Sequence, residues 1–347
     1  MPHRHDLLEM LLVALCAVLC GAEDCTDMAE FARAKLGFLR EFLKLEHGPP
    51  SHDTFSRLFR LLDPAQFRLC FQRFMDRFAE ACQGVVAIDG KTLRRSFDKA
   101  SGKSALHMVS AWSCEQRMVL GQLAVDAKSN EITAIPKLLR LLRLEGCAVT
   151  VDALNCQREI AQQIVDQKGD YVMALKGNQG TLHEDVRTFL DDPKTKLAVS
   201  EPMVDADHGR IETRTAMLST DIAWLQENHQ WPGLAAIGKV VRVREAADKT
   251  TTETVYYLLS AAMTPERFGE AVRSHWTIEN QLHWCLDVVM NEDQMRNRTG
   301  HSAENLAILR HPMLNLVRKE NSKGSLREKL HRAAWSDSFL AKVLTQV

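Results

Sequence analysis

Residues 85–90 read Val-Val-Ala-Ile-Asp-Gly, and here the pattern of apolar residues changes from helical spacing to short continuous runs. A short apolar run ending in Asp-Gly predicts a buried strand. Strand-like segments at 106–112 and 118–125 follow after short connections, which favours a β-meander. A helix from Asn130, a strand at 148–151, a helix, a strand at 171–175 and a helix at about 180–191 come next. This βββαβαβα order predicts a mixed α/β layer fold.

The chain on either side of this core has a different pattern. Residues 1–83 carry apolar side chains at helical spacing and predict an N-terminal helical domain. The first part of the core spans 84–196. Residues 197–264 hold strand-like pieces at 211–219, 235–244 and 253–261, which predict a mostly β insertion. Residues 265–347 are helical again, and we assign them to a last core helix and a C-terminal helical region.

Composition excludes several classes of protein. The 347 residues are 45% hydrophobic and 26% charged, which is typical of a soluble globular protein and not of a disordered, collagen-like or multi-span membrane protein. Nine cysteines without a CxxC pair favour reduced, buried thiols in a cytoplasmic protein. No membrane partner is expected, because the one long apolar run, at 10–22, is too short to span a bilayer. The apolar run at 10–22 resembles a secretory signal, but we expect a buried helix. A secreted protein stays an alternative, and an intact N-terminus by mass spectrometry would exclude it.

The net charge of -1 argues at first against a uniformly basic nucleic-acid binder. The average conceals two basic segments. Residues 294–347 hold ten Lys and Arg against four acidic residues, and residues 87–117 hold six against three. Basic charge is therefore concentrated in segments that could contact DNA.

Three acidic residues stand at points where elements end or meet: Asp89 after the first strand, Asp152 after the fourth, and Glu279 on a helix beyond the insertion. Carboxylates gathered at one point repel unless a cation binds them, and Mg²⁺ prefers oxygen ligands. Two such ions can promote phosphoryl displacement. Each residue also has a simpler local explanation. Asp89 could form a tight turn, Asp152 could cap the following helix, and Glu279 could be a solvated helix residue.

Seven motifs occur in order along the chain: 87–94 (AIDGKTLR), 128–132 (KSNEI), 151–153 (VDA), 174–179 (ALKGNQ), 208–210 (HGR), 275–280 (HWTIEN) and 282–288 (LHWCLDV). In these motifs the chain resembles the ISAs1-type insertion-sequence transposases, including the H-repeat-associated proteins. The resemblance implies an RNase H-like fold with a DDE triad, here Asp89, Asp152 and Glu279. It also implies Mg²⁺ at that triad, with Mn²⁺ as a substitute.

The same resemblance implies cleavage and strand transfer at the ends of the chain's own element. The partners would be the terminal inverted repeats, the target DNA and a second copy of the chain on the DNA. Two alternatives stay open: an inactive remnant that only binds DNA, and a host-adapted RNase H-like nuclease. Tyr, Arg and Lys flank the glutamate in the wider group, whereas this chain has Val272, His275 and Leu286. Pro312 inside a helical run is a further feature of a decaying copy.

Further residues are candidates for DNA contact, each with a local alternative. A strand edge explains Lys91 and Arg94, a helix-entry turn explains Asn178, and a packed loop anchor is the favoured reading of Trp231. Other polar groups are read as structural: Asn130 and Glu131 as a helix N-cap pair, and His283 with Asp287 as a helical pair. Glu292 and Asp293 are weaker, second-choice candidates for metal ligands. The full set of DNA-contact candidates is Lys91, Arg94, Lys176, Asn178, His208, Arg210, Trp231 and His275.

Overall fold

The computed structural model describes residues 5–75, 83–98, 102–125, 130–207, 210–246 and 249–346. Its centre is a mixed sheet in the order β3-β2-β1-β4-β5. β1 is parallel to β4, and β4 is parallel to β5, whereas β2 and β3 are antiparallel neighbours. The elements follow in the predicted order: β1 (Gly84–Leu93), β2 (Leu106–Ser113), β3 (Met118–Ala124), α6 (Glu131–Leu139), β4 (Cys147–Val151), α7 (Arg158–Asp166), β5 (Asp170–Leu175) and α8 (Gly180–Asp191).

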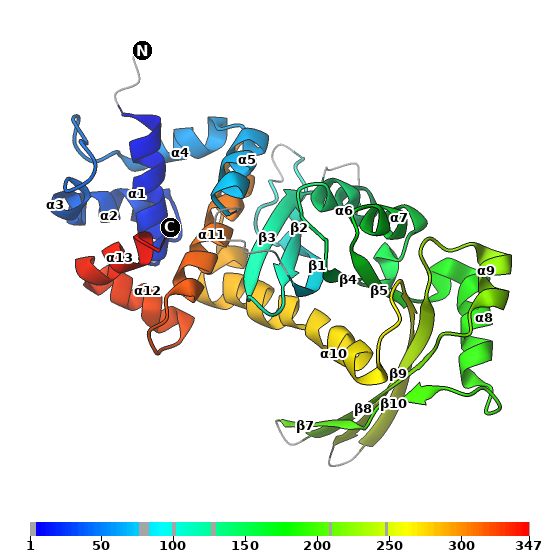
Figure 1. Cartoon of the computed structure of the whole chain (residues 1–347). Coiled ribbons are helices and arrows are strands. Elements are labelled where there is room, and N and C mark those ends of the chain that lie inside the picture. The colour runs from blue at the N-terminus through cyan, green and yellow to red at the C-terminus, as the bar shows by residue number, and fades with distance from the viewer. Residues whose placement is uncertain are drawn as a thin grey trace.

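The segment after α8 lengthens this sheet. β10 pairs antiparallel with β5, and β9 and β8 follow outward from it. Figure 1 shows these long strands bending away from the core beside α10. The mostly β character predicted for 197–264 is therefore present, as a continuation of the central sheet. Its elements are β6 (Ala198–Val199), β7 (Met203–Asp207), β8 (Arg210–Ser219), α9 (Ala223–His229), β9 (Ala236–Ala246) and β10 (Lys249–Leu259).

Helices from the two ends of the chain share one hydrophobic core. In Figure 1 the blue N-terminal helices lie beside the orange and red C-terminal ones. The apolar run near the N-terminus is the predicted buried helix, because residues 13–19 of α1 are all buried. The bounds are α1 (Leu7–Leu19), α2 (Cys25–Ala34), α3 (Leu36–Leu39), α4 (His52–Leu61), α5 (Pro64–Met75), α10 (Pro265–His275), α11 (Ser302–Lys319), α12 (Leu326–Trp335) and α13 (Asp337–Leu344).

Two of the exclusions made from composition can be compared with the described part of the chain. No helix there combines the length and apolar character needed to cross a bilayer. The eight cysteines that it includes are free thiols.

Pro312 lies inside α11, where a proline removes the hydrogen bond to the carbonyl four residues earlier. That carbonyl belongs to Ile308, and the Gln122 side chain on β3 donates to it at 3.2 Å. Asn315, one turn later, pairs with both backbone groups of Val119 at 2.9 Å. The sheet thus replaces the missing bond, and Pro312 fits the fold without interrupting the helix.

Candidate active site

Asp89, Asp152 and Glu279 line one cavity of about 290 Å³. β1 and β4 are paired in register through Ala87 and Thr150, so each aspartate lies two residues beyond the last matched pair. Because β1 and β4 are parallel and in register, Asp89 and Asp152 lie at the same level of the sheet, although β1 itself continues to Leu93. α10 packs against β1 and β4 and delivers Glu279 to the same cavity. The structure therefore unites the three acidic residues that the sequence singled out.

Glu279 lies in a π-helical segment, Ile278–His283, that continues α10. Such wide turns are rare and occur often at functional sites. The Trp112 indole on β2 donates to the Thr277 hydroxyl at 3.1 Å, two residues before the glutamate. Arg318 from α11 stacks over the Trp112 ring at 4.6 Å and donates to the Gln281 carbonyl. These contacts fix the segment on both sides of Glu279.

Burial dominates the electrostatics of the three carboxyls. It raises the pKa of Asp89 to about 7, although the Gly90 amide acts in the opposite direction. The negative charges of Glu131, Glu279 and Asp152 raise it further. Burial also raises the pKa values of Asp152 and Glu279. The ionised forms of these carboxyls are therefore unfavourable unless a positive charge stabilises them.

This donor set fits a hard divalent cation, because all three groups offer carboxylate oxygens. Within the described ranges, no three His, Cys, Asp or Glu side chains are already close enough to hold an ion together. Mg²⁺ commonly takes only one or two protein carboxylates and completes its shell with water and phosphate oxygens. The raised pKa of Asp89 is the observation that favours a cation here, since a positive charge would relieve it.

Sequence reasoning missed a second group of polar residues behind the aspartates. Asn130 caps α6 as predicted, because its side chain accepts from the Thr133 amide. Glu131, however, does not act only within the helix end. Its carboxylate contacts the His107 ring at 2.7 Å and accepts from the Asn155 amide at 2.8 Å. The available signal was the position of Glu131 at the start of the helix after the meander, which places it at the same sheet edge.

Lys91 does not face solvent, so the prediction that it contacts the DNA backbone is wrong for this structure. Its side chain is 8% exposed, and its ammonium lies 2.7 Å from Asp287 and 3.0 Å from Glu292. Asp293 follows at 3.4 Å. Glu292 and Asp293 are thus neutralised within the chain and are unsuited to a reserve metal site. Asp287 binds Lys91, whereas its predicted partner His283 lies 3.6 Å from Asp89.

Two other candidates are withdrawn from solvent: His275 is half-buried at the wall of the carboxylate cavity, and Trp231 is fully buried. His275 lies 2.9 Å from the Thr150 hydroxyl, and burial lowers its pKa to about 4. It is neutral at pH 7 and therefore does not replace the arginine that the wider group has at this position. Trp231 is 1% exposed, with the Arg158 guanidinium 5.1 Å from its ring. The packed-anchor reading therefore holds, and stacking on a base is excluded in this conformation.

The remaining candidates differ in their access to the cavity. Lys176 is exposed and lines it. Asn178 donates to the Ala153 carbonyl at 2.8 Å, which ties its loop to the residue after Asp152. Arg94 is 83% exposed, with its guanidinium 3.4 Å from Asp293. Arg210 is exposed at the outer end of β8, and His208 lies outside the described residues.

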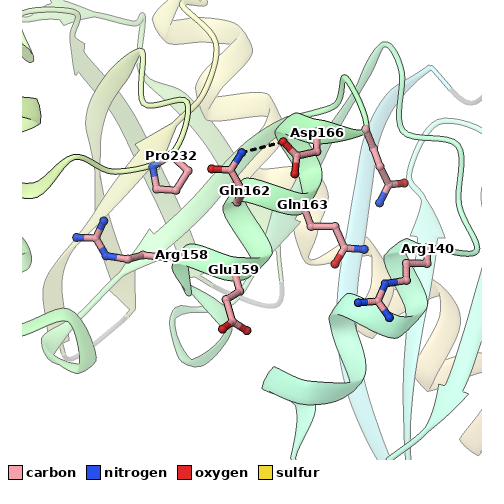
Figure 2. Close-up of a pocket in the computed structure, with 8 residues that line it drawn as sticks. Arg140, Arg158, Glu159, Gln162, Gln163, Asp166 and Pro232 are labelled. Carbon is pink, nitrogen blue, oxygen red and sulfur yellow. Dashed lines mark hydrogen bonds between the residues drawn. The ribbon is translucent and has the colours of Figure 1, made fainter.

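A larger and more open hollow of about 830 Å³ lies over α7. Its lining includes Arg140, Arg158, Glu159 and Gln163, and none of its residues belongs to the carboxylate cavity. Figure 2 shows these side chains pointing apart rather than toward a common centre. The hollow lacks the convergent groups of a reaction centre.

Comparison with known proteins agrees with this geometry. A family model described as "Transposase DDE domain" matches residues 80–316, and one described as "DDE_Tnp_1-associated" matches residues 2–75. The chain is 40% identical to the H repeat-associated putative transposase YhhI of Escherichia coli K12, covering 98% of this chain and 93% of that protein. It is 38% identical to the putative transposase YncI of Escherichia coli O157:H7, covering 98% and 90%. The chain therefore belongs to the transposase family defined by this DDE domain.

Proposed function

We propose that this chain is an ISAs1-type transposase with an RNase H-like core, which cuts the ends of its own element and joins them to target DNA. The observation that carries the proposal is the meeting of Asp89, Asp152 and Glu279 at one cavity from three separate parts of the chain. A second support is the raised pKa of Asp89, because a bound cation would stabilise the charged carboxylate that burial disfavours.

In this scheme the three carboxylates hold the cation, Mg²⁺ or its substitute Mn²⁺. The bound metal would activate the attacking oxygen and stabilise the leaving oxygen of an in-line displacement. The chain itself positions the DNA, with Lys176 and Arg273 at the cavity wall as exposed cations for a backbone phosphate. Water cuts the DNA end first, and the freed 3′-hydroxyl then attacks the target without a covalent protein–DNA intermediate.

The partners follow from this chemistry. The element's terminal inverted repeats and the target DNA are the substrates. Two ends must be brought together, so we propose that two copies of the chain assemble on the DNA in the cytoplasm. Exposed Arg94 and Arg210 are proposed contacts outside the cavity, as is His208 in the stretch that is not described.

The test is a cleavage assay on a duplex that carries one element end, with Mg²⁺ or Mn²⁺. Asp89→Asn, Asp152→Asn and Glu279→Gln should each abolish cutting while the protein remains folded and bound to DNA. The matched control is Glu159→Gln, an exposed acid at the start of α7. If all three variants cut as well as the parent, the site assignment is wrong.

The same assay separates the alternatives. Cutting without joining to a target duplex would select a host-adapted nuclease. Salt-sensitive DNA binding without any metal-dependent cutting would select an inactive remnant. The accommodation of Pro312 by β3 removes one of the features that suggested such a remnant.

A further inference from the structure

Glu131 lies directly against the backbone of β1 beside Asp89. A Cβ atom on Gly90 would overlap both the Glu131 carboxylate and the His107 ring, so residue 90 must be glycine for this approach. Successive side chains of a strand point to opposite faces of the sheet. Glu131 therefore reaches β1 from the face opposite to the Asp89 side chain and stands behind the cavity.

A continuous set of hydrogen bonds connects Glu131 to Asp152. The two hydrogens of the Asn155 amide nitrogen go to Glu131 at 2.8 Å and to Asp152 at 2.7 Å. Asn155 is completely buried, and its backbone amide donates to the same Asp152 oxygen at 3.2 Å. The Asn155 side chain thus fixes the Glu131 and Asp152 carboxylates relative to each other. A Glu131 that served only as part of a helix end would need no such link.

His107 fixes the other oxygen of Glu131. One ring nitrogen of His107 lies 2.7 Å from Glu131, and the other lies 2.8 Å from the Thr92 hydroxyl. The hydrogen bond from His107 is the main reason that the pKa of Glu131 is lowered, whereas the pKa of Asp89 is raised. Glu131 therefore remains ionised next to a carboxyl whose charge is costly.

We propose that Glu131 is a positioning residue of the carboxylate site, which orients Asp152 through Asn155 and maintains a fixed negative charge behind both aspartates. The inference rests on the proposed function, because it assigns Glu131 to the same cation site. Groups that hold metal ligands in place typically contribute about 10–100-fold to metal affinity or activity. Glu131 acts through Asn155 and does not line the cavity itself.

The experiment measures Mn²⁺ binding to the full chain by electron paramagnetic resonance, together with Mn²⁺-dependent cleavage and thermal unfolding. Glu131→Gln should weaken Mn²⁺ binding about tenfold while its melting temperature stays close to that of the control. The control is Glu159→Gln, which removes the same charge from the start of α7 away from the cavity. A purely structural Glu131 would lower the melting temperature and leave Mn²⁺ affinity unchanged.

A double-mutant cycle with Asn155→Ala tests the route. If Glu131 acts through Asn155, the two losses of Mn²⁺ affinity should not add. The double variant should then have about the same Mn²⁺ affinity as whichever single variant binds Mn²⁺ less tightly. Fully additive losses, or a Glu131→Gln protein that binds Mn²⁺ like the parent, would overturn the inference and leave the proposed function intact. A parent that neither binds Mn²⁺ nor cuts DNA would overturn both.

Discussion

Two groups of carboxylates lie beside β1, one around Asp89 and one around Lys91. They differ in whether cations of the chain contact them. Asp89 and Lys91 are two residues apart on β1, so they point to the same face of the sheet. Around Asp89, burial and neighbouring acids raise the pKa to about 7. Around Lys91, Glu292 is fully buried, yet Lys91 and Arg310 together hold its pKa below the usual value. The more deeply buried carboxyl is thus the one whose pKa is lowered, because cations contact it.

The difference separates structural from functional acids. The Lys91 cluster, formed by Lys91, Asp287, Glu292 and Asp293, contains its own cation and needs no external one. The cavity with Asp89 lacks such an internal cation within contact of its carboxylates in the described part of the chain. A group that keeps an uncompensated charge in a cleft is a candidate for binding a cation or substrate. Neighbouring residues of one motif therefore have different tasks.

The largest effect is expected from removing the internal cation. Lys91→Met removes the ammonium that Asp287, Glu292 and Asp293 share, although Arg310 stays 3.6 Å from Glu292 and Arg94 stays 3.4 Å from Asp293. Breaking a buried ion pair such as Lys91 with Glu292 costs about 3–5 kcal/mol. Urea unfolding at pH 7 measures the loss. Arg94→Met is the matched control, because Arg94 is 83% exposed and pairs with Asp293 only at 3.4 Å. Equal stabilities of the two variants would remove the contrast between the two groups.

The next effect is a gain in stability from an added cation. A ligand that binds only the folded state stabilises it by about 2.7 kcal/mol at one hundred times its Kd. Mn²⁺ should therefore raise the Tm of the parent protein and fail to do so for Asp89→Asn. Asp293→Asn, altered in the Lys91 cluster, should keep the gain. Thermal unfolding with Mn²⁺ and with chelator measures both, and a gain that depends on Asp293 instead would reverse the assignment.

Glu320 extends the comparison to a third buried carboxylate. Its side chain is fully buried, with Lys342 at 2.6 Å and Lys329 at 3.4 Å. Burial acts to raise the pKa of Glu320, but the hydrogen bonds from Lys342 and Ser322 outweigh it and lower the pKa to about 2. A carboxyl with a depressed pKa stabilises the fold above its unfolded pKa of about 4.3, and this stability is lost as pH falls toward 2.

Glu320→Gln should accordingly cost about 2 kcal/mol at pH 7, after allowance for the exposure of Lys342. The difference from the parent should shrink steadily as the pH falls from 5 to 3. Urea unfolding over this pH range measures it. A difference that is independent of pH would show that packing, and not the paired charge, accounts for the loss.

The fold was largely predictable because its signals are local. Apolar runs and helical spacing placed the elements from β1 to α8 in their order, and Ser51 and Asn130 cap α4 and α6 as their residue types favour. The pairing of β10 with β5 has no local signal. Nothing in the segment 249–259 distinguishes a strand that joins the central sheet from one in a separate layer. The shared core of the two ends of the chain is equally a result of long-range packing.

The site was predictable where a residue's place on an element determined its neighbours. Asp89 lies on β1 and Asp152 directly follows β4, and these strands are parallel neighbours, so the proximity of the two residues follows from the topology. Charge type alone failed for Lys91 and His275, since a basic residue near an acidic site can face either DNA or a buried acid. Glu131 was missed because a helix N-cap explains Asn-Glu completely at the level of sequence. Only the placement of His107 and Asn155 gives it a further role.

The smallest effect on stability, and the clearest contrast with Lys91, is expected at Arg94. An exposed pair of this kind contributes at most about 1 kcal/mol, so Arg94→Ala should unfold like the parent. If Arg94 contacts a phosphate, its removal should weaken binding to every duplex alike and reduce the slope of log affinity against log salt by about 1. Fluorescence anisotropy over a salt series measures the slope. An unchanged slope would confine the basic contacts to other residues, with Lys176 at the cavity as the first to examine.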